Sequence, residues 1–370
     1  MTTGLFSRAL GALALATAAL APALPAHAES LEAEFDKAFV PKAVTARSQL
    51  QAPAKAAPVK IQPSSESAQR VLPGTVRPFS AGVAPRVYGS GLDAQLAALA
   101  DPAAGRIGLA AIDLSSGRTV TVLGDVPFPM ASTSKIAIAS TFLAGVDDGR
   151  FSLDASYPLM VPVKSRKYSS AVAPVRPGAM LTGRQLIERS LIHSDNQATD
   201  ALLAVVGGPA AVNRWMRATG NTGMRLDRDI ATLVRDDGEY NPATMIDERD
   251  SATPLAMARL LSGLYQGRWL TANSRAFLIS TMEQCQTGKR RMRALLPSDA
   301  RIAHKTGTLS NTSSDVGLVR MPDGRVYAIA VYVTGQGGHA GRDAKIAAIS
   351  RTIYDGYAGD TAGYRMAAQR

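Results

Sequence analysis

Apolar residues are spaced as in β-strands near both ends of the folded part of the chain, and as in helices between them. Near the start, residues 107–113 and 119–123 flank the turn Ser115-Ser116-Gly117, a pattern that predicts a β-hairpin. Three more strands are predicted near the end, at residues 301–304, 316–321 and 326–334. A closing helix is predicted from the shared face of Ile346, Ile349 and Ile353.

This order of elements predicts an α/β (α+β) fold in two parts. One part is an antiparallel sheet domain formed by both ends of the chain, about residues 91–126 and 280–358. The other is an all-α domain inserted between them, about residues 127–279, and residues 359–370 are predicted to be a tail. The cleft between two such bodies is the usual place for a functional site.

The first 90 residues lack the pattern of a folded domain. Residues 1–28 combine Arg8, an Ala- and Leu-rich stretch and Ala26-His27-Ala28, which together predict a cleaved signal peptide and export to the periplasm. A retained N-terminal anchor is the alternative, but the apolar run is short for a bilayer and no stable membrane span is expected. Residues 29–90 are rich in Ala, Pro, Gln and Ser and predict a flexible tether.

Composition and charge limit which substrates, partners and metal sites are expected. The net charge of +11 favours anionic substrates or an anionic cell surface. Only 5% of the residues are aromatic and no basic-aromatic stripe is present, so nucleic acid is not expected as a partner. The single cysteine, Cys285, excludes an internal disulfide, and the four histidines lack the paired spacing of a metal site.

The first motif that suggests chemistry is Ser132-Thr133-Ser134-Lys135, which opens the apolar stretch 136–146. Ser132 and Lys135 are three residues apart and share a helix face, so a lysine of lowered pKa can take the serine proton. At a helix N-terminus, the backbone N–H of Ser132 can also stabilise an oxyanion. A capping serine followed by a surface lysine is the alternative for this motif alone.

Two further polar motifs follow. In Ser194-Asp195-Asn196, the Ser194 hydroxyl can relay a proton to a leaving nitrogen and Asn196 can hold a substrate amide, with a helix-capping cluster as the alternative. In Lys305-Thr306-Gly307-Thr308, a cation and a hydroxyl on a strand can bind a carboxylate, and the glycine lets a substrate lie close to the backbone. A strand-end turn with an exposed lysine is the alternative for that motif.

The order and spacing of the three motifs resemble those of penicillin-recognising serine enzymes, and the chain is similar to class A serine β-lactamases from about Gly91 to Tyr357. Smaller matches are Phe128-Pro129-Met130-Ala131, Arg225-Leu226-Asp227-Arg228, Asp247-Glu248-Arg249-Asp250, Thr253-Pro254 and Thr287-Gly288. The resemblance implies a β-lactamase/transpeptidase-like fold with an omega loop, closed at its neck by a salt bridge between Arg228 and Asp250.

The same resemblance implies hydrolysis of the β-lactam amide through an acyl-serine. Ser132 would attack the carbonyl, and Lys135, alone or with an omega-loop carboxylate and a water, would accept its proton. Ser194, with Lys305 beside it, would protonate the departing nitrogen. Further roles are the oxyanion hole, from the N–H groups of Ser132 and Thr308, and substrate binding by Asn196, Thr306, Gly307 and Thr308. No metal or other cofactor is implied, and a monomer acting on a small molecule is expected.

The omega loop departs from the family pattern, in which a glutamate stands four residues before an asparagine. Counted forward from Arg228, the place of the glutamate holds Ile230, and the loop is several residues longer than the pattern. Counted back from Asp250, the place holds Asp237, with Asn241 as its partner. Asp237 is therefore the predicted base for hydrolysis of the acyl-enzyme; Glu239 and the lack of an omega-loop base are the alternatives.

Four other residues have weaker assignments by the same resemblance. Tyr168 is predicted at the cleft mouth as an aromatic gatekeeper, with a loop tyrosine as the alternative. Arg291 is predicted to be a second carboxylate-binding arginine. His193 and His304 adjoin two motifs and are expected to serve in packing or support rather than in a Ser-His-Asp triad.

Two other functions remain open from the sequence. A D-alanyl-D-alanine peptidase or related peptidoglycan serine hydrolase shares the three motifs, and the altered omega loop keeps this alternative open. A non-catalytic penicillin-binding or cell-wall module is the second alternative, suggested by the long basic tether but opposed by the intact Ser132, Lys135, Ser194 and Lys305.

Overall fold

The computed structural model describes residues 75–80 and 90–368. The predicted signal peptide at residues 1–28 and most of the predicted tether lie outside the described residues. Across the described ranges, no helix has the length and apolar character needed to cross a membrane.

A five-stranded antiparallel sheet is the centre of the fold, and it confirms the predicted α/β (α+β) class. Its strands, in spatial order, are β10 (Arg301–Leu309), β11 (Thr312–Arg320), β12 (Val326–Thr334), β2 (Ile107–Asp113) and β3 (Thr119–Val122). Strands from both ends of the chain thus meet where β12 pairs with β2, and β10 is left at an edge. All nine residues of β12 are buried because both faces of the sheet are covered.

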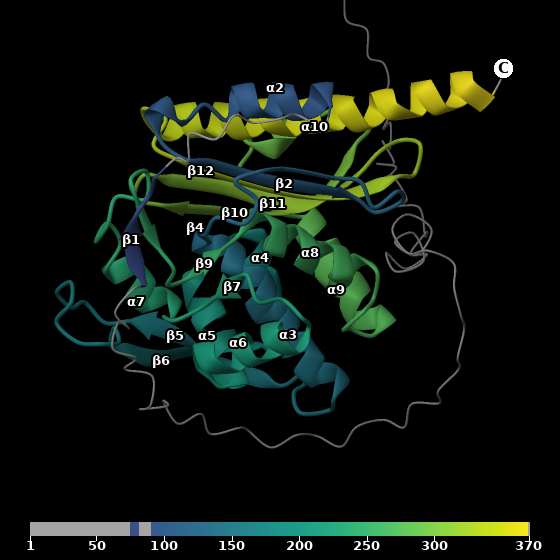
Figure 1. The fold of residues 1–370 in the computed structure, drawn as a ribbon. Helices are drawn as coiled ribbons and strands as arrows, with labels where there is room; N and C mark the ends of the chain where they lie inside the picture. Colours follow the sequence, from purple (N-terminus) through teal and green to yellow (C-terminus); the bar gives the residue numbers. More distant parts are fainter. Residues whose placement is uncertain (1–74, 81–89, 369–370) are drawn as a thin grey trace, which may run out of the picture.

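Two helices from opposite ends of the chain cover one face of this sheet, α2 (Gly91–Leu99) and α10 (His339–Ala368) (Figure 1). The predicted apolar face of α10, at Ile346, Ile349 and Ile353, is fully buried in the core between these helices and the sheet. The α10 helix continues to Ala368, so the predicted tail at 359–370 is helical over most of its length.

The other face of the sheet packs against the inserted helical part, with α8 (Pro254–Tyr265) next to β12 and β2. The remaining helices are α3 (Lys135–Asp147), α4 (Gly183–Ile192), α5 (Asn196–Val206), α6 (Gly208–Ala218), α7 (Ile230–Arg235) and α9 (Ala272–Glu283). Short strands accompany them: the hairpin of β5 (Ser156–Pro162) with β6 (Val175–Thr182), and β4 (Phe128–Pro129), β7 (Met224–Arg225) and β9 (Ser251–Ala252). A second hydrophobic core joins these helices to the sheet.

One part of the predicted tether belongs to the folded body, which corrects the range 29–90. Strand β1 (Val76–Pro78) pairs antiparallel with β8 (Met245–Asp247) of the omega-loop region. The pairing is extended by hydrogen bonds from Phe79 N to the Thr244 carbonyl, at 2.8 Å, and from Glu248 N to the Thr75 carbonyl, at 2.8 Å. The Ala/Pro-rich composition concealed this strand because only three residues pair.

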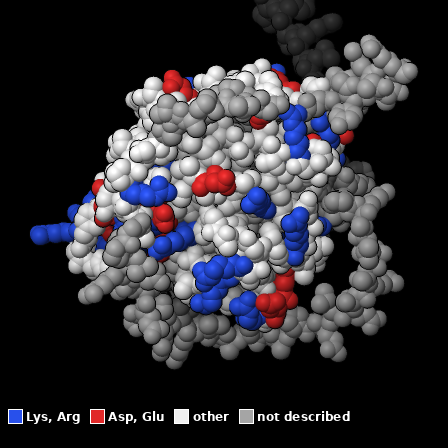
Figure 2. All heavy atoms as spheres, in the orientation of Figure 1, with Lys and Arg blue, Asp and Glu red and all other residues white. Residues whose placement is uncertain are grey.

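On the face drawn in Figure 2, Lys and Arg side chains lie at several separate places, with acidic side chains among them. On this face they form no continuous basic track along which a nucleic-acid backbone would lie.

Candidate active site

The nucleophile motif lies where a short 3₁₀ helix, Ala131–Ser134, leads into α3. Ala131 adopts a left-handed backbone conformation with φ of 48°, which is unusual for a residue with a Cβ atom. The strand β10 packs against this turn, and a Cβ atom on Gly307 would lie 2.6 Å from the Met130 carbonyl oxygen. Glycine at 307 therefore lets the third motif approach the first.

Ser132 lines a cavity of about 440 Å³. This cavity collects residues from all three motifs, together with the segment that follows α9. Among its lining residues are Ser132, Ser194, Asn196, Thr306, Thr308 and Arg291. Three motifs that lie far apart in the sequence are thus brought to one place.

Lys135 is fully buried at the start of α3 and is held by the second motif. Its Nζ donates hydrogen bonds to the Ser194 carbonyl, at 2.6 Å, to Asn196 Oδ1, at 2.8 Å, and to Ser194 Oγ, at 3.2 Å. Burial lowers the pKa of Lys135 well below its usual value, and the Lys305 ammonium lowers it further, against opposing effects of Asp200 and Asp195. A lysine of this kind can be the neutral amine that a serine nucleophile requires.

Ser194 lies between two lysines. Lys305 Nζ donates to Ser194 Oγ at 2.9 Å, while Lys135 reaches the same oxygen from the other side. Burial lowers the pKa of Lys305 to about 8, although the charges of Cys285 and Asp315 raise it. With both lysine nitrogens donating to its oxygen, the Ser194 hydroxyl has its own proton free for a group in the cavity.

Arg291 lies beneath the carboxylate-binding end of the cavity and is almost fully buried. Its Nη2 donates to Thr308 Oγ1 at 2.7 Å, its Nη1 to the carbonyl oxygens of Gly307 and Ser314, and its Nε to Asp343 at 2.7 Å. Because Thr308 Oγ1 accepts from Arg291, the Thr308 hydroxyl proton can point to a substrate anion.

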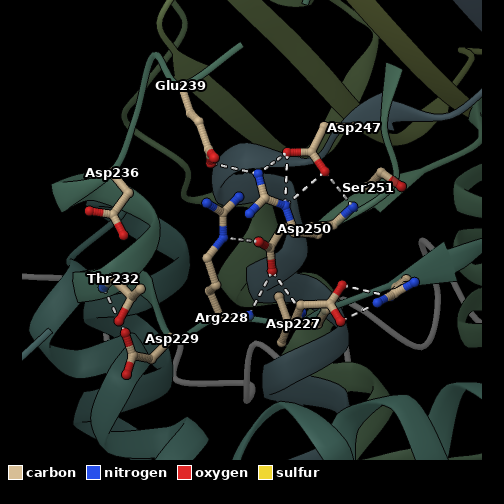
Figure 3. Close-up of polar contacts among 12 residues, drawn as sticks. Asp227, Arg228, Asp229, Thr232, Asp236, Glu239, Asp247, Asp250 and Ser251 are labelled. Atoms are coloured by element: carbon tan, nitrogen blue, oxygen red, sulfur yellow. Dashed lines mark hydrogen bonds and ion pairs between the residues drawn. The ribbon is translucent and has the colours of Figure 1, made fainter. Parts of the chain in front are cut away.

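The omega-loop neck is closed as the resemblance implied. Arg228 Nε contacts Asp250 Oδ2 at 2.6 Å, and Asp250 Oδ1 accepts from the backbone N–H groups of Asp227 and Arg228 (Figure 3). Glu239 and Asp247 both contact Arg249 on the neighbouring side of the neck (Figure 3). The Glu239 carboxylate is therefore engaged with a guanidinium.

Asp237, Glu239 and Asn241 lie away from the cavity of Ser132, and the two acidic residues line a second hollow. Asp237 Oδ2 accepts a hydrogen bond from Ser310 N at 2.8 Å, just beyond the end of β10. Asn241 Oδ1 accepts from Asn311 Nδ2 at 2.8 Å. The structure thus places the predicted base and its partner at the turn between β10 and β11, and it does not bring them to Lys135.

Tyr168 is exposed, contacts the same part of the omega loop and is not among the residues that line the Ser132 cavity. Its backbone N–H donates to Asp236 Oδ1 at 3.0 Å and its hydroxyl to the Asp236 carbonyl at 3.1 Å. The neighbouring Lys167 donates from Nζ to the Asp237 carbonyl. The lengthened loop therefore contacts both the segment around Tyr168 and Ser310.

The omega-loop helix α7, which begins at Ile230, has no acidic residue and contacts Asp200. The buried Asp200 of α5 accepts hydrogen bonds from Ile230 N, at 2.7 Å, and from Ala231 N, at 2.9 Å. Burial raises the pKa of Asp200 to about 7, and Lys135 opposes this shift. The sequence reasoning missed Asp200, although it stands four residues after Asn196 and so on the same face of a helix.

Of the two histidines beside the motifs, His304 is buried and His193 is exposed. His304 Nδ1 bonds to Asp315 Oδ1 at 2.8 Å inside the sheet, and His193 ends helix α4. Among the described residues, no group of three or more His, Cys, Asp or Glu side chains is arranged to hold a metal ion.

Comparison with known proteins agrees with this geometry. The family model described as the beta-lactamase enzyme family matches residues 91–357. The chain is 33% identical to the β-lactamase CTX-M-8 of Citrobacter amalonaticus over 284 residues, which are 75% of this chain and 93% of that protein. It is 30% identical to the β-lactamase SME-1 of Serratia marcescens, over 62% of this chain and 76% of that protein.

Two solved structures extend the similarity. An ancestral (GNCA) class A β-lactamase is 35% identical, with a TM-score of 0.62 over 72% of this chain and 99% of that one. A β-lactamase from Chitinophaga pinensis is 29% identical, with a TM-score of 0.64 over 72% of this chain and all of that one. The chain therefore belongs to the beta-lactamase enzyme family.

Proposed function

We propose that the residues around Ser132 carry out the reaction of this family, hydrolysis of the β-lactam amide bond through an acyl-serine intermediate. The observation that carries the proposal is the buried hydrogen-bonded group of Lys135, Ser194 and Lys305 at the cavity that Ser132 lines. Such a group can move one proton from the serine to the departing nitrogen without another cofactor.

In the first step, neutral Lys135 takes the Ser132 proton as the oxygen attacks the lactam carbonyl. The N–H groups of Ser132 and Thr308 stabilise the oxyanion. When the C–N bond breaks, Ser194 donates its proton to the nitrogen and regains one from the lysines that contact it. The substrate carboxylate lies against Thr306 and Thr308, with the Arg291 charge behind them, and Asn196 holds the side-chain amide.

For hydrolysis of the acyl-enzyme, we propose Asp200 as the carboxylate that shares the proton of Lys135. The support is that Asp200 acts electrostatically on Lys135 and contacts the omega loop at Ile230 and Ala231, and that a pKa of about 7 suits a general base. Asp237 and Glu239, the candidates from the sequence, line a second hollow, and neither is among the groups that act on Lys135.

Three variants separate these bases. Asp200→Asn is expected to slow hydrolysis by about 10²- to 10⁴-fold and to trap one adduct per protein in intact-mass spectra, whereas Asp237→Asn and Glu239→Gln are expected to turn over freely. Trapping by Asp237→Asn alone would restore the sequence-based assignment. Ser132→Ala must abolish both the adduct and turnover of a chromogenic cephalosporin, and an adduct on that variant would overturn the nucleophile.

A D-alanyl-D-alanine peptidase is the second candidate, because Ile230 occupies the position beside Asp200 where a carboxylate of the loop would otherwise stand. An enzyme of that kind would retain a fluorescent penicillin as a lasting label and turn over the cephalosporin slowly. Rapid turnover with no lasting label is the result expected for the β-lactamase.

We also propose that the chain acts as a monomer after export to the periplasm. The support for export is the signal-like sequence of residues 1–28, which ends at Ala26-His27-Ala28. N-terminal sequencing of the protein recovered from the periplasm is expected to begin at Glu29, and light scattering is expected to give the mass of one chain. A mature protein that still begins at residue 1 would indicate a retained anchor instead.

A further inference from the structure

A buried thiol, imidazole and carboxylate form a line behind the carboxylate-binding end of the cavity. Asp315 of β11 bonds to His304 Nδ1 at 2.8 Å, and both side chains are fully buried. Gly317 makes room for the imidazole, since a Cβ atom there would lie 2.8 Å from both Cα and Cβ of His304. Cys285, two residues beyond the end of α9, is 4% exposed, and its thiol and this imidazole influence each other electrostatically.

His304 Nε2 is the imidazole nitrogen that does not bond to Asp315. It is buried without a conventional hydrogen bond to any described residue, and the Cys285 thiol acts on the same imidazole. The Asp315 carboxylate raises the pKa of His304 to about 9, against the effect of burial. Although burial alone would raise the pKa of the Cys285 thiol, His304 and Thr287 lower it to about 7.

The thiol is connected to the cavity by two threonines. Thr287 Oγ1 lies 3.3 Å from Cys285 Sγ and 2.5 Å from Thr306 Oγ1. Thr306 belongs to the third motif and lines the cavity, as does Thr287. A continuous chain of hydrogen bonds therefore leads from the buried thiol to a hydroxyl that faces the substrate.

The direction of such a chain depends on which end supplies the proton. When His304 is protonated, it cannot accept from the thiol, so a neutral Cys285 donates to Thr287 Oγ1. Thr287 then donates to Thr306, and the Thr306 proton points to the cavity. When Cys285 is a thiolate, it is a strong acceptor that takes the Thr287 proton, and Thr306 must donate to Thr287 instead.

We propose that Cys285 is a positioning residue whose proton sets the direction of the hydrogen bonds through Thr287, so that Thr306 donates to the substrate carboxylate only while the thiol is protonated. The inference rests on the proposed function, because it takes a carboxylate-bearing β-lactam as the ligand. Cys285 does not line the cavity and touches no substrate, so it acts only through Thr287 and Thr306.

The other charged groups near Cys285 do not reproduce this effect. His304 and Lys305 face it from β10, and Asp315 of β11 stands behind His304. Glu283, two residues earlier on α9, is influenced by Arg301 and Arg320 rather than by the thiol. Lys305 has a pKa of about 8 and Asp200 a pKa of about 7, and both groups are present in the parent and in the Cys285→Ser chain, so the difference between their two pH profiles reports on Cys285.

The test measures binding of intact benzylpenicillin by calorimetry to the full chain carrying Ser132→Ala, which removes the chemical step. The dissociation constant is expected to rise about threefold between pH 5.5 and 7.5, part of a limit of about tenfold for the loss of one donor to a carboxylate. Adding Cys285→Ser keeps a donor that does not ionise, so the part of the rise that depends on Cys285 is expected to disappear and binding to stay tight. Adding Thr287→Val removes the oxygen that competes for the Thr306 proton, so binding is expected to be tight and to lose the same part of the rise.

Because Cys285 is the only cysteine in the chain, thiolate absorbance near 240 nm reports its ionisation directly and is expected to rise over the same pH range. A Cys285→Ser profile with the slope of the parent would overturn the proposal, as would a Thr287→Val profile with that slope. Failure of the Ser132→Ala chain to bind benzylpenicillin at any pH would instead overturn the proposed function, and this proposal with it.

Discussion

The strand before the catalytic domain is expected to hold the omega loop in place, and shortening the chain tests this directly. A chain that begins at Gly74 keeps β1, whereas one that begins at Ala81 lacks it, although the two differ by only seven residues. Besides the β1–β8 ladder, the shorter chain lacks two backbone hydrogen bonds and the stacking of Phe79 on Arg106, whose guanidinium lies 5.2 Å from the ring centre.

The two hydrogen bonds and the stacking of Phe79 on Arg106 contribute about 1 kcal/mol each. Together these three interactions stabilise the closed loop by about 3 kcal/mol. Since 1.4 kcal/mol corresponds to a factor of ten, local opening of residues 242–248 is expected to become about a hundredfold more frequent in the shorter chain. Hydrogen exchange followed by mass spectrometry measures this opening, with β12 as the internal reference. Equal exchange of residues 242–248 in the two chains would refute the role of β1.

Three further predictions follow from the site. Asp250→Ala is expected to lower the free energy of unfolding by about 3–5 kcal/mol, because it leaves the largely buried Arg228 without its partner. Chemical denaturation measures this loss, and a loss below about 1 kcal/mol would contradict the prediction. Gly307→Ala is expected to abolish turnover with an unchanged circular dichroism spectrum, because the added Cβ would meet the Met130 carbonyl; full activity would contradict the packing. His304 has a pKa of about 9 in the folded chain, above its unfolded value, so protonated His304 stabilises the fold fully below about pH 6.5 and this stabilisation is lost as the pH rises toward 9. The melting temperature is therefore expected to fall over that range, and less steeply in the His304→Gln variant. An equal slope in the two chains would contradict the prediction.

The sheet could be predicted from the sequence because its strands are buried on both faces. β12 and β2 read as nearly continuous apolar runs, which leaves little choice of element. The hairpin of β5 and β6 could not be read in the same way, since Pro158, Pro162 and Pro177 interrupt it and most of its side chains are at least partly exposed.

The three motifs of the candidate site could be predicted because each is local in sequence, but the conformation of the omega loop could not. Counting from the two ends of a lengthened loop gives different residues, and the contact of Asp200 with Ile230 is visible only in the folded chain. The pair of Cys285 and His304 was equally inaccessible, because the two residues come from the end of a helix and an edge strand that meet only in the folded chain.

The site holds three cations at one cavity, and the placement of the anions explains how it tolerates them. Each of these basic groups is influenced by a nearby acid: Asp343 contacts Arg291, Asp315 acts on Lys305, and Asp200 acts on Lys135. These pairings offset part of the cost of burying the basic groups. Neutralising any of the three acids is therefore expected to act through the basic group that it influences.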